Sequence, residues 1–158
     1  MRVVRMRFGV VLGRGDGAYP MLALSSRLGL GAVLGSGRQP APWIHLDDAV
    51  GLVRFALADG SFAGAVNAVA PQTPSQSDFA RALAASFGRR VHLRVPYAAL
   101  RLMLGEMAEL LLEGQHALPS VALAAGYPFR HPTLDGALAV LAARTGLDVV
   151  PQAGPTAL

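Results

Sequence analysis

The 158-residue sequence contains no cysteine and no lysine, and each absence excludes a class of chemistry. Without cysteine, the chain can form neither a disulfide bond nor a thiolate nucleophile. Without lysine, it has no Schiff-base nucleophile, no Walker-type phosphate loop and no Tyr-x-x-x-Lys pair. Any chemistry must therefore come from other side chains.

Long uninterrupted hydrophobic runs are also missing, although 53% of the residues are hydrophobic. The longest stretches without charge, such as residues 60–77, contain prolines and polar amides, so none has the pattern of a membrane span. The arginine-containing start leads into an apolar segment without a small-residue cleavage site, which gives no support for secretion. We therefore expect no membrane association and a cytoplasmic location.

All of the positive charge on side chains that stay ionised comes from arginine, and the formal net charge is +4. The arginines stand singly between apolar segments, apart from Arg89 and Arg90, and no aromatic residues alternate with them. This pattern is typical of a solvated surface rather than of a nucleic-acid interface. We expect no nucleic-acid partner.

A glycine pattern follows the first expected strand, residues 3–12. Residues 13–18 fit Gly-x-Gly-x-x-Ala and precede an expected helix over residues 18–28. In a dinucleotide fingerprint these glycines let the backbone approach a pyrophosphate, and Arg38 would accept a 2′-phosphate. The alternative is a flexible loop after a strand, because a single glycine pattern is weak evidence.

Strand and helix patterns alternate along the rest of the chain, which indicates an α/β fold. Two prolines favour an extended segment over residues 126–132, and the tail beyond Pro151 is expected to be disordered. Further strands are expected over residues 29–35, 65–70 and 91–95, and helices over residues 73–88, 96–105, 117–125 and 133–146.

Residues 34–48 combine a glycine turn, a short strand led by Trp43 and the start of a helix. Pro40 and the proline two residues later prevent a helix before Trp43. Asp47 or Asp48 is expected to cap the helix that follows. Its apolar positions recur at helical spacing: Leu46, Val50, Val53 and Leu57.

His45, on this strand, has two interpretations. It is either a base oriented by Asp47 or a histidine that completes a wall and hydrogen-bonds locally. Trp43 is expected in the core or lining a pocket. No two of the four histidines have the three- or four-residue spacing that zinc sites favour, so we expect no metal. Three acids at helical spacing are expected to form a solvated face: Glu106, Glu109 and Glu113.

Several spaced motifs resemble, in order, the second half of nucleoside-diphosphate-sugar epimerase-like proteins, which belong to the extended short-chain dehydrogenase/reductases. These motifs are residues 7–12 (RFGVVL), 29–31 (GLG), 34–39 (LGSGRQ) and 43–48 (WIHLDD). A later set is similar to the C-terminal domain of unknown function in that subfamily: residues 105–112, 114–115, 118–119 and 126–132. The resemblance covers nearly all of residues 5–142.

The resemblance implies the C-terminal portion of a Rossmann-type α/β protein. Residues 1–72 would supply the last Rossmann strands and substrate-side loops, residues 73–150 a small α/β substrate domain, and residues 151–158 a tail. The family implies NADP as cofactor, held by a first half with a glycine-rich loop and a Tyr-x-x-x-Lys pair, neither of which this chain contains. We therefore expect no catalytic or cofactor-binding residue in this chain, and residues 13–17 become a substrate-side loop.

Four residues would line the substrate side of the cleft: Arg38, Gln39, Trp43 and His45. Ala41 occupies the position where many relatives place a diphosphate-binding arginine, and Pro40 replaces a frequent aromatic residue. The expected function is the substrate-binding half of an NADP-dependent sugar-nucleotide epimerase or reductase, inactive alone. Its expected partners are a small-molecule substrate and either the missing first half or a second copy. The alternative is a non-catalytic partner-binding or dimerisation module that uses an apolar surface left by absent strands.

Overall fold

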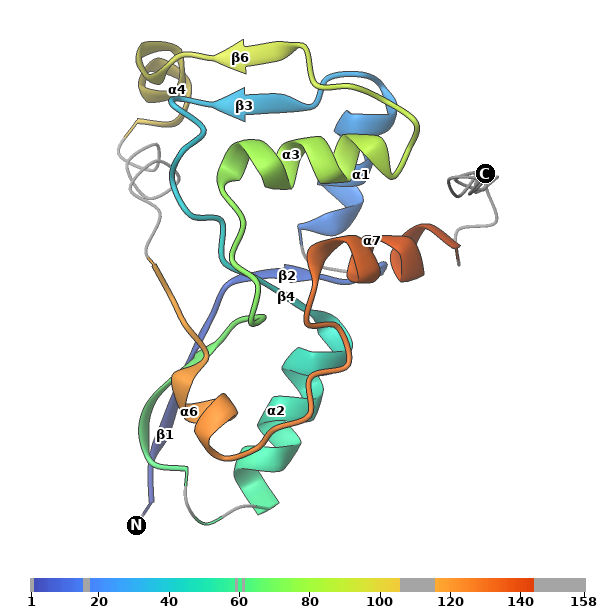
Figure 1. Cartoon of the computed structure of the whole chain (residues 1–158). Helices are drawn as coiled ribbons and strands as arrows, with labels where there is room; N and C mark the ends of the chain where they lie inside the picture. The colour runs from blue at the N-terminus through green and yellow to red at the C-terminus, as the bar shows by residue number, and fades with distance from the viewer. Residues whose placement is uncertain (1, 16–17, 59, 61, 106–115, 144–158) are drawn as a thin grey trace, which may run out of the picture.

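The computed structural model describes residues 2–15, 18–58, 60, 62–105 and 116–143. Strands and helices are interspersed along this part of the chain, in agreement with the α/β prediction (Figure 1). The strands are β1 (Val4–Phe8), β2 (Val10–Leu12), β3 (Ala32–Leu34), β4 (Trp43–His45), β5 (Gly64–Ala68) and β6 (Leu93–Val95). The helices are α1 (Tyr19–Arg27), α2 (Leu46–Ala58), α3 (Gln76–Ala85), α4 (Tyr97–Leu104), α6 (Ser120–Ala124) and α7 (Leu134–Ala143).

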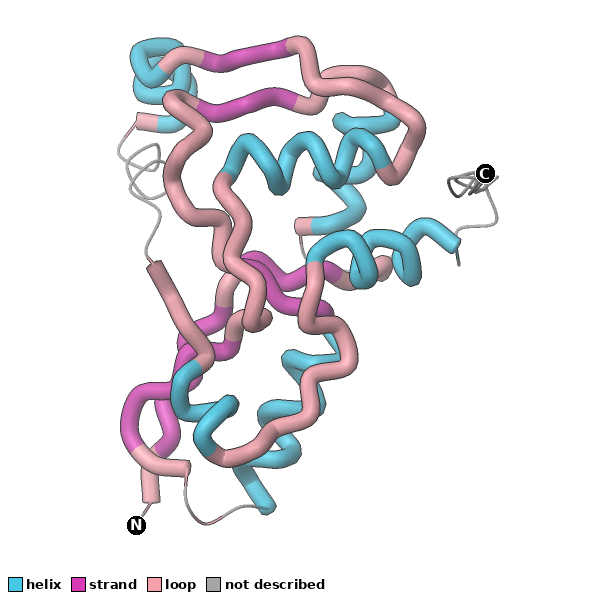
Figure 2. The backbone as a smooth tube through the Cα atoms, in the orientation of Figure 1, coloured by secondary structure: helices cyan, strands magenta, loops and turns pink. Residues whose placement is uncertain are grey.

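The strands form three parallel pairs, β1 with β5, β2 with β4, and β3 with β6 (Figures 1 and 2). Parallel strands need crossover connections, and each connection here contains a helix: α1 lies between β2 and β4, α1 and α2 lie between β1 and β5, and α2 and α3 lie between β3 and β6. The two segments predicted as late Rossmann strands, residues 4–12 and 65–70, do lie side by side in β1 and β5. Parallel α/β architecture is thus confirmed.

The first strand is not continuous, contrary to the prediction for residues 3–12. It breaks at Gly9, whose N–H donates to the carbonyl of Ala68, while the N–H of Val10 donates to the carbonyl of Pro42. The chain therefore changes its partner from β5 to β4 at this point. A Cβ atom on Gly9 would lie 2.6 Å from the carbonyl oxygen of Pro42, which explains why glycine stands at the break.

The first strand is also less buried than predicted. Phe8 is 48% exposed and Val10 39% exposed, and only Leu12 is completely buried. Among the described residues, β1 pairs with β5 alone, so one edge of β1 is open. Val4 and Met6 of β1 pack partly against the core, whereas Phe8 is exposed.

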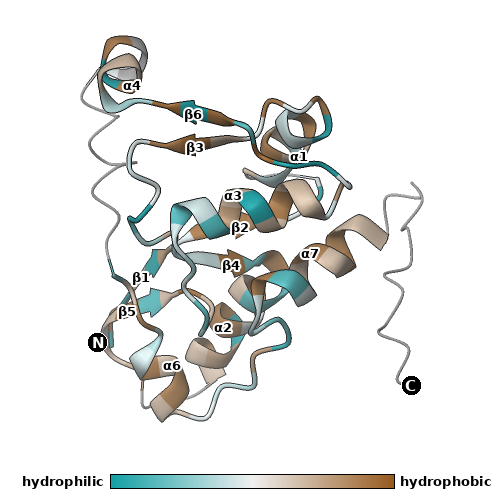
Figure 3. Cartoon of the chain, turned by 45° about the horizontal axis from the view of Figure 1, so that its top comes forward, coloured by the Kyte–Doolittle hydropathy of each residue, from teal (hydrophilic) through white to brown (hydrophobic). Residues whose placement is uncertain are grey.

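Two hydrophobic clusters form the core, and β4 joins them. Trp43 packs in the first cluster with residues of α1, α3 and α7, whereas Ile44 packs in the second with residues of α2, β5 and α6. Successive residues of a strand point to opposite faces, so one short strand supplies both clusters. The apolar colouring of α6 and α7 in Figure 3 agrees with their role in covering the strands.

Helix α2 buries a different face from the one its periodicity predicts. The buried positions are Asp48, Ala49, Leu52 and Ala56. The apolar positions on which the prediction rested are exposed: Leu46 by 41%, Val50 by 51%, Val53 by 37% and Leu57 by 74%. The helix therefore has two apolar faces, and the described residues cover one.

Other expected elements are present with shifted ends. Ser75 caps α3, because its hydroxyl oxygen accepts the N–H of Asp78 at 3.2 Å. The strand expected over residues 29–35 is β3, and the helix expected over residues 117–125 is α6. The three glutamates of residues 106–113, the end of the last helix and the tail lie outside the described residues. None of the described helices combines the length and apolarity that a bilayer crossing requires.

Candidate functional site

A buried carboxylate organises the start of α2. Asp48 is completely buried, and its two oxygens accept the backbone N–H groups of Arg130 and His131, each at 2.8 Å. Such charge-assisted bonds offset the cost of removing a carboxylate from water. Asp48 thereby fastens an extended segment, 82 and 83 residues further along the chain, to the helix.

Tyr127 strengthens this attachment. Its hydroxyl lies 3.2 Å from the backbone carbonyl of Asp48 and 3.4 Å from one carboxylate oxygen. Burial, followed by the charge and the hydrogen bond of Asp48, raises the pKa of Tyr127 to about 12. The phenol sits where a Cβ on Gly51 would collide with its oxygen, so glycine leaves room for the hydroxyl in the helix surface. We call Asp48, Tyr127 and the backbone of residues 130 and 131 the Asp48 clamp.

The clamp holds His131 against His45. The two imidazole centroids are 3.9 Å apart with planes tilted by 37°. The Asp47 carboxylate lies beside both rings, because its Oδ2 atom is 3.6 Å from Nδ1 of His45 and 3.6 Å from Nε2 of His131. The chain therefore brings two histidines and an acid together, and each of the three offers one potential metal-ligand atom within 4.8 Å of the others.

His45, rather than either aspartate, caps α2. Its Nδ1 atom accepts the N–H of Asp47 at 3.1 Å, while Asp47 and Asp48 lie within the first turn. The prediction that an aspartate caps this helix is therefore wrong, because the helix begins at Leu46, two residues before the position that a cap at Asp47 needs. The interpretation of His45 as a locally bonded strand residue agrees with this geometry.

The electrostatic surroundings of His45 favour the neutral ring. Burial lowers its pKa, and His131 lowers it further, whereas Asp47 and Asp48 act in the opposite direction. Because Nδ1 is an acceptor, the proton of the neutral ring resides on Nε2. That buried atom has no hydrogen-bond partner among the described residues.

A hollow of about 210 Å³ adjoins this cluster. His45 and Asp47 line one side of it, Arg14 and the neighbouring glycines line another, and Val140 and Leu141 of α7 complete it. Arg14 is held in place because its Nη2 atom donates to the carbonyl of Val140 at 2.7 Å. The glycine loop thus lies across this hollow from His45. A Cβ on Gly15 would meet no atom within 4 Å, so the described structure gives no close backbone approach at that position.

The four residues expected on the substrate side differ in their exposure. Trp43 is completely buried, and its indole N–H donates to the carbonyl of Gln72 at 2.9 Å. Gln39 is also buried, where its amide donates to the Leu34 carbonyl. His45 is buried beside His131, and Arg38 is exposed.

Arg38 belongs to a loop whose shape is fixed from within. The Gln39 oxygen accepts the hydroxyl of Ser36 at 3.3 Å, and the Ser36 hydroxyl oxygen accepts the N–H of Arg38 at 3.3 Å. From β6, the guanidinium of Arg94 donates to the Ser36 carbonyl at 3.4 Å. Two exposed arginines consequently belong to this loop or contact it.

The partnership of His45 with His131 is the part of the site that sequence reasoning missed. The two residues are 86 positions apart, and spacing within a helix gives no signal for such a pair. The available hint was the extended, proline-bounded segment 126–132, which has few internal hydrogen bonds and needs partners elsewhere.

Comparisons with known proteins identify relatives of this chain. Residues 95–141 match the family described as "Domain of unknown function (DUF1731)". The chain is 46% identical over 138 residues to the epimerase family protein SDR39U1 of Mus musculus, covering 87% of this chain and 47% of that protein. The chain thus spans about half the length of the curated relatives it matches.

Solved structures agree with this relationship. The crystal structure of human epimerase family protein SDR39U1 (isoform 2) with NADPH superposes with a TM-score of 0.85 and 42% identity, covering 90% of this chain and 48% of that one. The nucleoside-diphosphate sugar epimerase from Corynebacterium glutamicum gives a TM-score of 0.67 and 28% identity, covering 87% and 25%. The chain corresponds to the C-terminal part of the epimerase family proteins, which are Rossmann-type extended short-chain dehydrogenase/reductases.

Proposed function

We propose that this chain is the substrate-binding half of an NADP-dependent sugar-nucleotide epimerase or reductase, and that it has no activity alone. The observation that carries the proposal is the uncovered apolar surface at one end of the molecule, in a chain that spans about half of its relatives. In this proposal residues 1–72 complete a Rossmann sheet, residues 73–150 form the substrate domain, and the whole protein is cytoplasmic.

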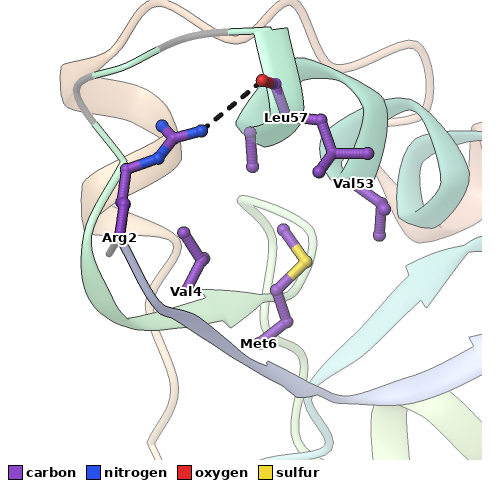
Figure 4. A pocket seen from close by; sticks show the side chains of 6 residues that line it. Arg2, Val4, Met6, Val53 and Leu57 are labelled. Carbon is purple, nitrogen blue, oxygen red and sulfur yellow. Dashed lines mark hydrogen bonds between the residues drawn. The ribbon is translucent and has the colours of Figure 1, made fainter.

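The uncovered surface consists of the open edge of β1 and the outer face of α2. Between them lies a hollow of about 220 Å³, which Figure 4 shows with Val4 and Met6 on one side and Val53 and Leu57 on the other. Arg2 bridges its end by donating to the Leu57 carbonyl at 3.4 Å (Figure 4). Exposed apolar surface of this kind indicates an absent protein layer. We propose that the layer is the cofactor-binding half, which would extend the parallel sheet from β1.

NADP belongs to that absent half in this proposal. The chain has no Tyr-x-x-x-Lys pair and no Gly-x-x-Gly-x-x-Gly loop. When bound, the cofactor would supply hydride transfer. The residues of this chain would position the substrate rather than exchange its proton.

The loop of residues 34–39 is the proposed recognition element for the diphosphate of a sugar nucleotide. The exposed guanidinium of Arg38 offers planar, paired donors to phosphate oxygens. Gln39 and Trp43 act from buried positions, Gln39 by bonding within the loop and Trp43 by fixing the strand that follows it. His45 is the last residue of β4, the strand that begins at Trp43.

Titration calorimetry of the purified chain with UDP-glucose tests this role. We expect binding that Arg38→Ala weakens about tenfold or more, because a charge-assisted hydrogen bond contributes about 1.5–3 kcal/mol. Arg89→Ala, which removes an exposed arginine after α3, is the matched control and should bind normally. Equal affinity in wild type and Arg38→Ala would contradict the recognition role. Turnover of the sugar nucleotide with NADP by this chain alone would contradict the claim of inactivity.

The second candidate is a non-catalytic module that pairs with another copy through the same apolar surface. Exposure of Val50, Val53 and Leu57 on one helix face favours it. Light scattering separates the candidates: a dimer that Val53→Asp converts to monomer supports self-association. A wild-type monomer that binds a separately expressed cofactor-binding half supports the first candidate.

A further inference from the structure

The geometry points to a divalent transition-metal site formed by His45, Asp47 and His131, with Zn²⁺ as the best-matched ion. The proposal goes beyond sugar-nucleotide recognition and is independent of it. Two imidazoles and one carboxylate are ligand types that Zn²⁺ accepts, and three protein ligands leave one position open.

Distances within the cluster approach those of a coordination polyhedron. For bonds of about 2.0–2.1 Å, the ligand atoms of a tetrahedral zinc site lie about 3.3 Å apart. Asp47 Oδ2 is 3.6 Å from Nδ1 of His45 and 3.6 Å from Nε2 of His131, and the three ligand atoms lie within 4.8 Å of one another. Small movements of the two more exposed side chains, Asp47 and His131, are enough to close the set.

His45 carries its ring proton on Nε2, which is the tautomer that coordination through Nδ1 requires. The residue is 5% exposed, and its Nδ1 lone pair faces the Asp47 carboxylate, whose Oδ2 atom is 3.6 Å away. Coordination at Nδ1 would replace the bond from the Asp47 N–H, and a first-turn N–H can bond to water instead. That exchange is the main cost of the site.

Rigid elements hold the proposed ligands. His45 ends β4, Asp47 lies in the first turn of α2, and the Asp48 clamp fixes the backbone of His131. Residues that hold metal ligands in place fix the orientation of those ligands before the metal binds. Part of the entropy lost in ordering the ligand side chains is therefore lost during folding rather than on metal binding.

The adjoining hollow suits the open coordination position. His45 and Asp47 line it together with Arg14, so an anion or water bound to the ion would face a guanidinium. The Arg14 charge opposes a bare cation, whereas Asp47 and the buried Asp48 favour one. The sequence-based expectation of no metal rested on helical spacing, which cannot detect ligands 86 residues apart.

The test is Zn²⁺ binding to the full chain by titration calorimetry, with the visible spectrum of a Co²⁺ complex as an independent readout. We expect one ion per chain and a tetrahedral Co²⁺ spectrum. His131→Ala and Asp47→Asn should each weaken binding about tenfold or more. The clamp uses the backbone N–H of His131, so the alanine variant retains it.

His92→Ala is the matched control, because His92 is exposed and lies outside the cluster. It should bind Zn²⁺ as the wild type does. Absence of binding to the wild type, or equal weakening by His92→Ala, would overturn the proposal. If circular dichroism shows that His131→Ala is unfolded, Asp47→Asn decides alone, and unchanged affinity in that variant overturns the site.

Discussion

Replacement of Asp48 by alanine should destabilise the chain strongly. The change removes the acceptor of two backbone N–H groups at 2.8 Å and the carboxylate partner of the Tyr127 hydroxyl. A buried donor left without an acceptor costs about 1–3 kcal/mol, and these half-buried donors should each cost a value toward the lower end of that range. Relief from burying a charge offsets part of this loss. We therefore expect the free energy of unfolding to fall by about 3 kcal/mol, a large share of the roughly 5–15 kcal/mol of an ordinary domain.

Trp43 supplies the assay, because it is the single tryptophan of the chain and is completely buried. Its fluorescence should report urea unfolding, and for a denaturant slope of about 2 kcal/mol/M the midpoint should fall by about 1.5 M. Asp135→Ala is the control, since that exposed acid lies in the first turn of α7 and should contribute less than about 1 kcal/mol. A loss for Asp48→Ala no greater than for Asp135→Ala would refute the clamp.

Two further predictions concern a glycine and a tyrosine. Gly9→Ala should destabilise the chain by about 1–3 kcal/mol in the same urea assay, because its Cβ would meet the Pro42 carbonyl at 2.6 Å. Gly15→Ala is the control, since a Cβ there has open space and should change the stability little. Equal effects of the two substitutions would contradict the close approach at the strand break. The pKa of Tyr127 is raised to about 12 in the folded state. Above pH 10 the folded state therefore keeps a phenol proton that the unfolded state loses. The stability linked to this proton is present below pH 10 and is lost as the pH rises toward about 12. Alkaline unfolding curves should show this fall in wild type and a smaller one in Tyr127→Phe, and identical curves would contradict the assignment.

Local chemistry made much of the fold predictable. The helix predicted within residues 73–88, the strand β3 between glycine turns and the strand–helix junction at residues 43–48 all follow from side chains close in sequence. These features depend on backbone restrictions and short-range hydrogen bonds, so the residues themselves carry the signal.

Tertiary partners account for the errors. The apolar periodicity of α2 identified one apolar face but could not show which of the two apolar faces is buried. The face that it identified includes Val50 and Val53, and both residues are exposed. The cap at His45 depended on where the helix begins, a boundary that propensity fixes within a few residues at best. His131 joined the site only through Asp48, a partner distant in sequence.

The parallel pairing of strands also has a consequence for how the chain folds during synthesis. Val4 pairs opposite Gly64, and Ala32 pairs opposite Leu93, so each of these ladders joins segments about sixty residues apart. Non-local pairing of this kind slows folding, because a long loop must close before contacts compensate for the entropy lost. During synthesis, β1 has no partner strand until residues 64–68 have left the ribosomal exit tunnel, and β3 has none until residues 93–95 have left it. During that interval the unpaired edges of these strands are exposed to aggregation, and chaperones that bind unpaired strands would protect them.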